Sequence, residues 1–497
     1  MISLNRQPEI CNWQQATGNR QPVTGNRQPE TCNWQPVTGN RKPLTGNRQP
    51  SNKHMKLWQK KITTSEAVES FTVGNDREMD MHLAPFDIQG SLAHIKMLES
   101  IGLLSADEWK VLSAELKNIY KEIESGNFFL EEGIEDIHSQ VELLLTKRLG
   151  EVGKKIHSGR SRNDQVLVDL KLFFRNAIEQ LVQNIQNLFR LLQQKSDEYK
   201  EHLLPGYTHL QLAMPSSFGL WLGAYAESLV DDVITLQSAY KVVNKNPLGS
   251  AAGYGSSFPL NRTYTTELLG FENLNYNVVY AQMSRGKSER IVAHALSNAA
   301  ATLNKLCMDC CLYMNQNFAF ISFPDELTTG SSIMPHKKNP DVFELIRAKC
   351  NQLQALPNDV TLLTTNLPSG YHRDFQLLKE YLFPAIVAIN SCIDMMHLMI
   401  SNIKVRQNLL NDERYKYLFS VEEVNKLVLQ GVPFRDAYKK VGLAIEEDRF
   451  EYSTALNHTH EGSIGNLCTK QIAEAMHEAI EAFGFEKYQE AIRKLLS

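Results

Sequence analysis

The chain has 497 residues, of which 42% are hydrophobic and 22% are charged, and its formal net charge is −4 at pH 7. This length allows two or three domains with a large core. The small negative charge argues against a general nucleic-acid binder, and eight cysteines scattered along a chain of this size indicate reduced thiols in the cytosol rather than a disulfide framework.

Residues 1–54 repeat one short unit. The sequence "TGNRQP" begins at Thr17, Thr24 and Thr45, and its variant "TGNRKP" begins at Thr38. Glycine and proline recur in every unit and apolar heptad pairs are missing, so the spacing does not predict a coiled coil. We expect a low-complexity, disordered tail that the activity does not require.

The rest of the chain has the pattern of long helices. Ser105 followed by Glu108 is a capping box in front of an amphipathic stripe. After Asp164, apolar residues recur in steps of three and four as far as Leu192, which predicts one helix of about 40 Å. Patterns that alternate as strands do are scarce by comparison.

The sequence therefore predicts an all-α protein, with a central bundle of long helices flanked by smaller N-terminal and C-terminal helical domains. The expected ranges are 55–159, 160–411 and 412–497. The most apolar window begins at Tyr381 and is interrupted by Pro384 and by further polar residues, so it predicts a buried helix rather than a membrane span.

Four polar islands interrupt the helical patterns. They are "HSGRSRNDQ" from His157, "PGYTHLQ" from Pro205, "GSSIMPHKKNP" from Gly330 and "LPSGYHRDFQLLK" from Leu367. Each lies at the end of a helical pattern, where backbone donors are unpaired and side chains can converge. The islands are rich in cations and neutral hydrogen-bonding groups, without metal-ligand spacing or a nucleotide fingerprint. They predict a small polycarboxylate ligand, bound without metal or organic cofactor, and no nucleic-acid or membrane partner.

The island "GSSIMPHKKNP" resembles the signature loop of the fumarase/aspartase superfamily, whose common reaction is a reversible β-elimination that releases fumarate. The motifs "GRSRNDQ", "GYTHLQ" and "NPLGSAAGYGSSFPLNR" resemble the argininosuccinate lyases in particular, and the resemblance extends from Lys56 to the C-terminal region. It implies a homotetramer whose active sites are shared between subunits, and cleavage of argininosuccinate to arginine and fumarate. Two alternatives stay open: a sister lyase, such as adenylosuccinate lyase or aspartase, and an inactive crystallin-like homologue.

The resemblance also implies roles for individual residues. Ser331 takes the part of the base and His209 protonates the departing guanidino nitrogen, although the sequence leaves open which of the two gives and which takes a proton. Lys337 would stabilise the dianionic intermediate, and Glu344 would tune the imidazole. The expected substrate contacts are Ser161, Arg162, Asn163, Thr208, Asn339, Tyr371, Gln376 and Lys379.

Overall fold

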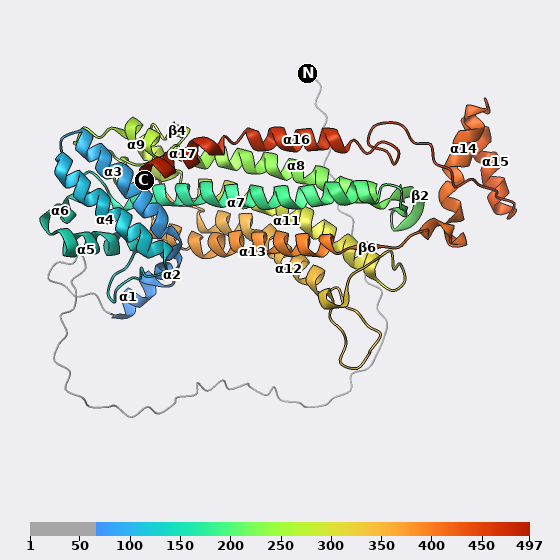
Figure 1. The fold of residues 1–497 in the computed structure, drawn as a ribbon, viewed down its shortest axis with the longest axis horizontal. Helices are drawn as coiled ribbons and strands as arrows, with labels where there is room; N and C mark the ends of the chain where they lie inside the picture. The colour runs from blue at the N-terminus through green and yellow to red at the C-terminus, as the bar shows by residue number, and fades with distance from the viewer. Residues whose placement is uncertain (1–65) are drawn as a thin grey trace, which may run out of the picture. The chain divides into compact units, whose positions relative to one another are not determined.

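The computed structural model describes residues 66–497, so the expected repeat tail at 1–54 lies outside the described residues. Long helices dominate this part of the chain and lie lengthwise beside one another (Figure 1), which confirms the all-α prediction. Their contacts form a closed ring: α7 packs on α8, α8 on α11, α11 on α12, α12 on α13 and α13 on α7. The five helices of this bundle are α7 (Arg162–Glu198), α8 (Phe218–Val243), α11 (Lys287–Met314), α12 (Asp341–Leu363) and α13 (Leu378–Ser401).

Helix α7 is the longest of these helices. Its 37 residues contain no glycine or proline and span about 55 Å at 1.5 Å per residue. Ser161 and Asp164 form a capping box at its beginning, which stabilises the first turn. The predicted helix is confirmed and continues six residues beyond Leu192, where the hydroxyl of buried Ser196 donates to the carbonyl of Gly219 on α8.

Shorter helices surround the beginning of α7. Helix α3 packs on both α4 and α7, and α17, from the C-terminal end of the chain, packs against α3 and α9. The capping box predicted at Ser105 and Glu108 is present at the start of α4. These helices are α1 (Glu66–Val73), α2 (Asp76–Asp80), α3 (Ala84–Ser100), α4 (Ala106–Glu124), α5 (Ile137–Leu149), α6 (Glu151–Lys154), α9 (Arg262–Leu268), α10 (Val278–Met283) and α17 (Phe485–Leu496).

The other end of α7 carries a β-hairpin that the sequence patterns did not predict. Strand β1 (Leu203–Thr208) pairs antiparallel with β2 (Gln211–Ser217). Two further ladders in the described chain are only two residues long on each side. They are β3 (Lys245–Asn246) with β4 (Asn273–Leu274), and β5 (Ile321–Ser322) with β6 (Lys404–Val405).

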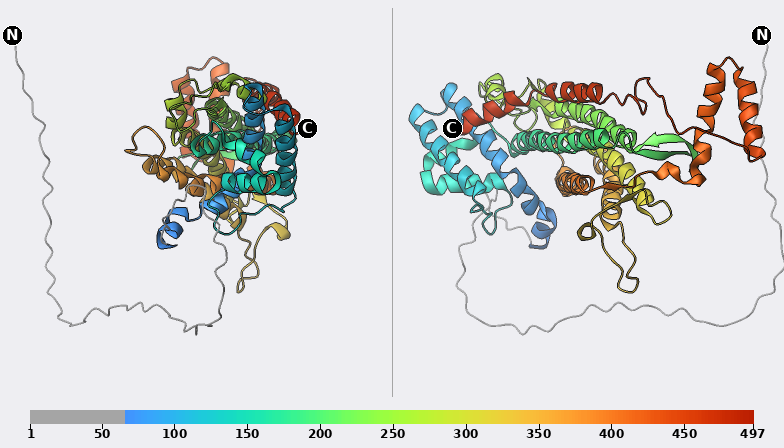
Figure 2. Two further views of the ribbon diagram at one scale, coloured as in Figure 1. Left: turned by 90° about the vertical axis from the view of Figure 1, so that its left-hand side faces the viewer. Right: turned by 45° about the vertical axis from the view of Figure 1, so that its right-hand side comes forward.

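The range 412–497 contributes helices to two places (Figure 2). Helices α14 (Ser420–Leu429) and α15 (Phe434–Glu446) pack on each other around a small apolar core of their own. Helix α16 (Thr469–Glu481) instead lies along α8, before α17 returns to α3. The expected domain boundaries stay a prediction.

Helix α13 is the apolar segment that was expected to be a buried helix. Together with the 3-10 turn before it, at 373–401, it is the one helix of residues 66–497 that is long and apolar enough to cross a membrane by length and composition alone. Half of its apolar 18-residue stretch is buried inside the protein, as in a core helix. The other face is exposed and carries apolar residues, including Val387 and Leu398.

Candidate active site

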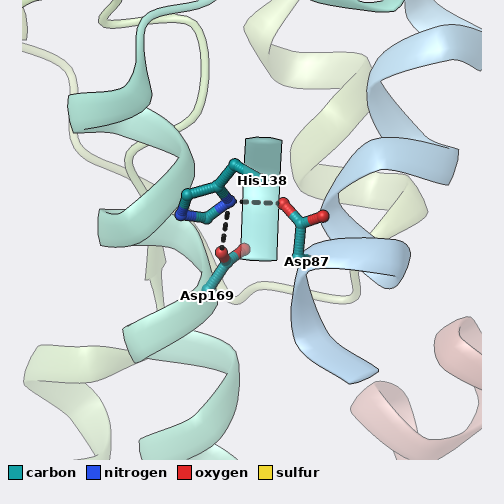
Figure 3. Close-up of side chains that lie close together, drawn as sticks. All are labelled: Asp87, His138 and Asp169. Atoms are coloured by element: carbon teal, nitrogen blue, oxygen red, sulfur yellow. Dashed lines mark hydrogen bonds and ion pairs between the residues drawn. The ribbon is translucent and has the colours of Figure 1, made fainter. Parts of the chain in front are cut away.

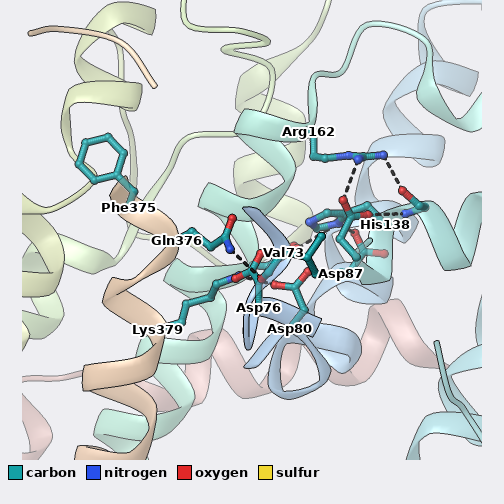
Figure 4. Close-up of polar contacts among 12 residues, drawn as sticks. Val73, Asp76, Asp80, Asp87, His138, Arg162, Phe375, Gln376 and Lys379 are labelled. Carbon is teal, nitrogen blue, oxygen red and sulfur yellow. Dashed lines mark hydrogen bonds and ion pairs between the residues drawn. The ribbon is translucent and has the colours of Figure 1, made fainter. Parts of the chain in front are cut away.

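A cavity of about 240 Å³ lies beside the first turn of α7. Its wall combines residues from α2, from α7, from the 3-10 turn 373–376 and from the start of α13, which are far apart in sequence (Figure 4). Five of the expected substrate contacts line this cavity: Arg162, Asn163, Tyr371, Gln376 and Lys379. The other lining residues are Val73, Asp76, Asp80, Glu135, Asp136, Val166, Arg285 and Arg373.

The first turn of α7 is held in place by its own cap. The Ser161 hydroxyl accepts from the backbone N–H of Asn163, so this side chain completes the helix end and is not part of the cavity wall. The buried carboxylate of Asp164 accepts from three backbone N–H groups, those of Ser161, Gly249 and Ala251. These bonds connect the motif "GRSRNDQ", at the first turn of α7, with the motif "NPLGSAAGYGSSFPLNR", which contains Gly249 and Ala251.

Arg162 spans the cavity wall toward α5. Its guanidinium forms an ion pair of 2.7 Å with Asp136 and donates to the hydroxyl of Ser139 at 2.6 Å. Burial acts to raise the pKa of Asp136, but His138 and Arg162 together hold that pKa below its usual value. Asp136 is therefore ionised, and it both caps α5 and positions the guanidinium.

Lys379 lies between two carboxylates of α2. Its ammonium group contacts Asp76 at 2.5 Å and also pairs with Asp80, although only about 4% of the lysine side chain is exposed. Burial acts to lower the pKa of Lys379, but Asp80 and Asp76 outweigh that effect and raise it. The lysine is thus a fixed positive charge at the floor of the cavity.

The 3-10 turn next to Lys379 is held by hydrogen bonds on two sides. The Gln376 side chain donates to the carbonyls of Thr72 and Val73 at 3.1 and 3.0 Å, which ties the turn to the end of α1. From the other side, Arg285 donates to the carbonyl of Phe375 at 3.0 Å. The guanidinium of Arg285 is itself held by Glu289 at 2.8 Å, and both side chains are buried.

A buried ion cluster lies behind this wall (Figure 3). The Nδ1 atom of His138 is 2.8 Å from Asp87 and 3.6 Å from Asp169, so α3, α5 and α7 meet at these side chains. Burial acts to lower the pKa of His138, but the carboxylates, Asp87 first, raise it to about 9. Burial also raises the pKa of Asp169 well above its usual value, so Asp87 is the main counter-ion of the imidazolium.

This trio is also the one group in residues 66–497 whose ligand atoms lie close enough together to hold a metal ion, all within 4.8 Å. A metal would need the neutral imidazole, whereas the raised pKa of His138 favours the protonated form at neutral pH. The positive charge of Arg160 also acts on Asp169. We interpret the cluster as a buried ion pair that supports the cavity wall. The protonated imidazole of His138, rather than a metal ion, balances the charge of the carboxylates.

The expected catalytic residues, and the expected substrate contact Thr208, lie outside this cavity. Thr208 and His209 are at the tip of the β1–β2 hairpin, and His209 and Leu210 form its two-residue turn, both with positive φ (54° and 57°). Positive φ at both positions is the signature of a type I′ turn. For residues other than glycine this conformation is costly, and such strain is common at functional sites. The turn presents an exposed imidazole at the end of the hairpin.

The loop "GSSIMPHKKNP" is exposed along most of its length. Its base is closed by pairing of Thr329 with Asn339, and the Ser331 hydroxyl accepts from the backbone N–H of Met334 at 3.2 Å. Lys337 is exposed, and Glu344 follows in the first turn of α12, also exposed. None of these side chains lines the cavity described above.

The two groups of expected residues lie at opposite ends of the bundle. Asn163 is at the beginning of α7, whereas His209 follows its end, about 55 Å along the axis. Thr364, just beyond the end of α12, lies beside Gly286 and therefore close to the cavity. The loop "GSSIMPHKKNP" precedes the other end of α12, so the 23-residue helix separates this loop from the cavity by about 35 Å. One chain alone does not bring the cavity, the hairpin and the loop together.

Comparison with known proteins shows which family the chain belongs to. The model of a family described as lyase matches residues 56–355. A Parabacteroides distasonis protein named argininosuccinate lyase is 62% identical over 441 residues, which are 89% of this chain and 99% of the relative. The chain belongs to the argininosuccinate lyase family. A more distant member, from Thermotoga neapolitana, is 38% identical over 386 residues, 78% of this chain and 97% of its own.

Solved structures confirm the fold of the family. An EDDS lyase variant with bound fumarate has a TM-score of 0.67 at 19% identity, covering 87% of this chain and 97% of its own. A class II fumarase from Schistosoma mansoni has a TM-score of 0.62 at 15% identity, covering 83% and 95%. At such identities the likeness concerns the fold alone. It agrees with the long-helix bundle expected from the resemblance to the fumarase/aspartase superfamily.

The structure adds cavity residues that the motifs did not indicate. Asp76 and Asp80 are one helical turn apart on α2, and Asp136 and Arg285 complete the ion pairs of the wall. A signal was present in "NDREMD", because two acids at i and i+4 lie on the same face of a helix. Their lysine partner is about 300 residues further along the chain, and no local pattern connects the two.

Proposed function

We propose that the protein catalyses the reversible β-elimination of argininosuccinate to L-arginine and fumarate, a reaction of arginine biosynthesis. The observation that carries this proposal is the similarity to relatives named argininosuccinate lyase, which are 59–62% identical over 441 residues and matched over 99% of their own length. Such a reaction needs a soluble small-molecule substrate and no nucleic acid, and we expect the enzyme in the cytosol.

The proposed mechanism begins with removal of a proton next to a carboxylate of the substrate. Ser331 acts as the base, and Lys337 with the loop amides stabilises the oxyanion and the dianionic intermediate. His209 delivers a proton to the departing guanidino nitrogen, directly or through water, with Glu344 tuning the imidazole. Because the loop is exposed and joined to the body at the Thr329–Asn339 pairing, it is free to close over a bound substrate.

The cavity is suited to the arginine half of the substrate. Its wall contains four acidic side chains, Asp76, Asp80, Glu135 and Asp136. Four basic side chains lie in the same wall, Arg162, Arg285, Arg373 and Lys379, so the cavity offers partners of both signs. An amino-acid half needs such partners because it carries an ammonium group besides its carboxylate, whereas a fumarate dianion carries negative charge alone. Asn163, Tyr371 and Gln376 would add neutral hydrogen-bonding contacts. The catalytic loop and His209, with Thr208 and Asn339, would contact the succinate half.

We further propose that the enzyme is a homotetramer with shared active sites. The cavity is separated within one chain from both the hairpin and the loop by tens of ångströms, so a complete site needs parts from other copies. The central helices also carry exposed apolar side chains, among them Leu345 and Leu362 on α12 and Val387 on α13, at 62–66% exposure. A second copy packed on these helices would bury them and bring the far ends of the bundle next to a neighbour's cavity.

The substrate is tested by incubating the protein separately with argininosuccinate, adenylosuccinate and aspartate and following fumarate release. We expect release from argininosuccinate alone, and its loss in a Ser331→Ala variant. Release from adenylosuccinate or aspartate alone would identify a sister lyase. A folded protein inactive with all three substrates would favour the crystallin-like alternative.

Shared sites are tested by co-expression of two inactive variants, Ser331→Ala and Asn163→Ala. If each site combines parts of different subunits, some sites in mixed tetramers contain both native side chains, so partial activity returns. Sites built within one chain would remain inactive in every mixture. Sedimentation of the same samples gives the number of subunits.

A further inference from the structure

The ion cluster at the floor of the cavity has two carboxylates for one ammonium group. Asp76 and Asp80 both contact the Nζ atom of Lys379, and Asp80 also accepts a hydrogen bond from it. Asp80 and Lys379 are almost completely buried, with 2% and 4% of their side chains exposed. Asp76 is the exposed member of the three, at 18%, and it lines the cavity.

Arg162 and Arg285, two other cations of the wall, do not supply the missing charge. Arg162 is paired with Asp136, and Arg285 is paired with Glu289. Burial is the main cause that raises the pKa of Asp76 to about 6, with repulsion from Asp80 adding to it against the attraction of Lys379. The cluster is therefore short of one positive charge on the side that faces the cavity.

The cavity also offers partners for an anion beside Asp76. The Nε atom of Arg373 donates hydrogen bonds to the carbonyl of Thr72 and to the side-chain oxygen of Gln376. Arg373 lines the cavity together with Tyr371. An α-amino acid requires a carboxylate that lacks a full counter-ion and a guanidinium within one cavity, because its ammonium and carboxylate groups are separated by a single carbon atom.

From this geometry we infer that Asp76 binds the α-ammonium group of the arginine half and so determines specificity for an amino acid at this end. Asp80 and Lys379 act as positioning residues that hold the Asp76 carboxylate at the cavity surface. The inference rests on the proposed function and adds to it a contact for the amino-acid end. The guanidino group would instead lie toward the catalytic loop, because its nitrogen is the leaving atom.

The test compares two ligands that differ only in the α-ammonium group: L-arginine and 5-guanidinopentanoate. Their binding to the full-length protein is measured by calorimetry, which does not depend on turnover. A hydrogen bond between charged groups contributes roughly 10-fold or more in affinity, so we expect the wild type to prefer L-arginine by about that factor. In Asp76→Asn this preference should fall to about 2-fold or less, while binding of 5-guanidinopentanoate changes little.

Controls separate recognition from folding. Asp107→Asn removes an acid from α4 that is 95% exposed and should behave as the wild type. Asp76→Glu keeps the negative charge and should retain part of the preference. We expect Asp76→Asn to unfold at the wild-type temperature or above, because it removes a carboxylate whose ionisation is disfavoured by burial. In steady state its KM for argininosuccinate should rise about 10-fold with kcat changed less than about 3-fold.

A pH series provides a second readout. The charged groups that act most strongly on Asp76 are Lys379, Asp80 and Asp136. The same cavity is also lined by Glu135 and by the guanidinium groups of Arg162, Arg285 and Arg373. As pH falls through about 6, Asp76 gains a proton, so wild-type affinity for L-arginine should fall while that of Asp76→Asn does not. The loss of affinity is assigned to the ammonium contact only if the affinity for 5-guanidinopentanoate does not fall over the same pH range.

Several results would overturn the inference. One is an unchanged preference for L-arginine in Asp76→Asn, and another is tighter binding of L-arginine, which would mean that Asp76 merely shields Lys379 from the substrate carboxylate. An equal loss for both ligands would show contact with the guanidino group or a structural effect. If the wild type cleaves argininosuccinate and one of these results is found, only this inference fails. If it neither cleaves argininosuccinate nor binds L-arginine, both fail.

Discussion

Replacing His138 by glutamine should remove a pH-dependent part of the stability. The imidazolium of His138 lies between Asp87 and Asp169, and all three side chains are about 2% exposed or less. Glutamine can still donate a hydrogen bond to Asp87, but it cannot supply the positive charge. The substitution leaves a buried carboxylate without its counter-ion, which typically costs about 3–5 kcal/mol.

The size and sign of the pH effect follow from the pKa of His138, which rises from 6.5 to about 9 on folding. A difference of roughly 2.5 units corresponds to about 3 kcal/mol. Because the folded-state pKa is the higher one, this stabilisation is fully present below about pH 6.5 and is lost as pH rises through about 9. The gap between wild type and His138→Gln should therefore shrink by about 3 kcal/mol between those limits.

The gap is measured by urea unfolding at about pH 6 and about pH 9.5, at one protein concentration because assembly also contributes to stability. His477→Gln serves as the matched control, since this histidine is 73% exposed on α16. Its free energy of unfolding should equal that of the wild type at both pH values. A gap for His138→Gln that stays constant or widens with pH would refute the reasoning, because it would show that His138 is neutral in the folded protein.

Three further substitutions test other parts of the structure. Ser161→Ala should lower the free energy of unfolding by about 1 kcal/mol through loss of the helix cap and leave KM unchanged; a raised KM would instead support the substrate contact expected from the sequence. Arg285→Lys should raise KM roughly 10-fold, since lysine cannot hold both its carboxylate partner and the carbonyl of Phe375 in the same fork geometry. Gly219→Ala should destabilise by about 3 kcal/mol, because an added Cβ would lie 2.5 Å from a backbone carbonyl of α7, whereas Gly442→Ala, in open space on a helix, should be neutral or stabilise by up to about 1 kcal/mol in the same melts.

The fold class could be predicted because the relevant signals are local. A helix is specified by contacts between residues three and four apart, so the apolar stripe after Asp164 and the cap at Ser105 were sufficient. The hairpin between α7 and α8 was missed for the corresponding reason. Its turn uses positive φ at His209 and Leu210, where the sequence offers neither glycine nor asparagine as a signal.

The motifs predicted a set of site residues, which stays a prediction, but not how those residues are arranged within one chain. Motifs placed Asn163 and Lys379 in one site, and the structure does bring them to one cavity. The same motifs placed His209 and Ser331 with them, and a single chain leaves those two at the far end of the bundle. The resemblance implied that subunits share each site, but the motifs do not specify which copy of the chain supplies each part, because that depends on packing between subunits.

The sequence by itself determined the helices, their caps and the chemical types of residue at the site, since each is encoded over a few neighbouring positions. Only the tertiary structure decided which charges meet. Asp80 pairs with Lys379, 299 residues away, because α2 packs on α13. His138 pairs with Asp87, 51 residues away, because α5 packs on α3. Burial then decides how strongly these charges interact, because a carboxylate that is exposed to water in the unfolded chain needs a partner once water is excluded.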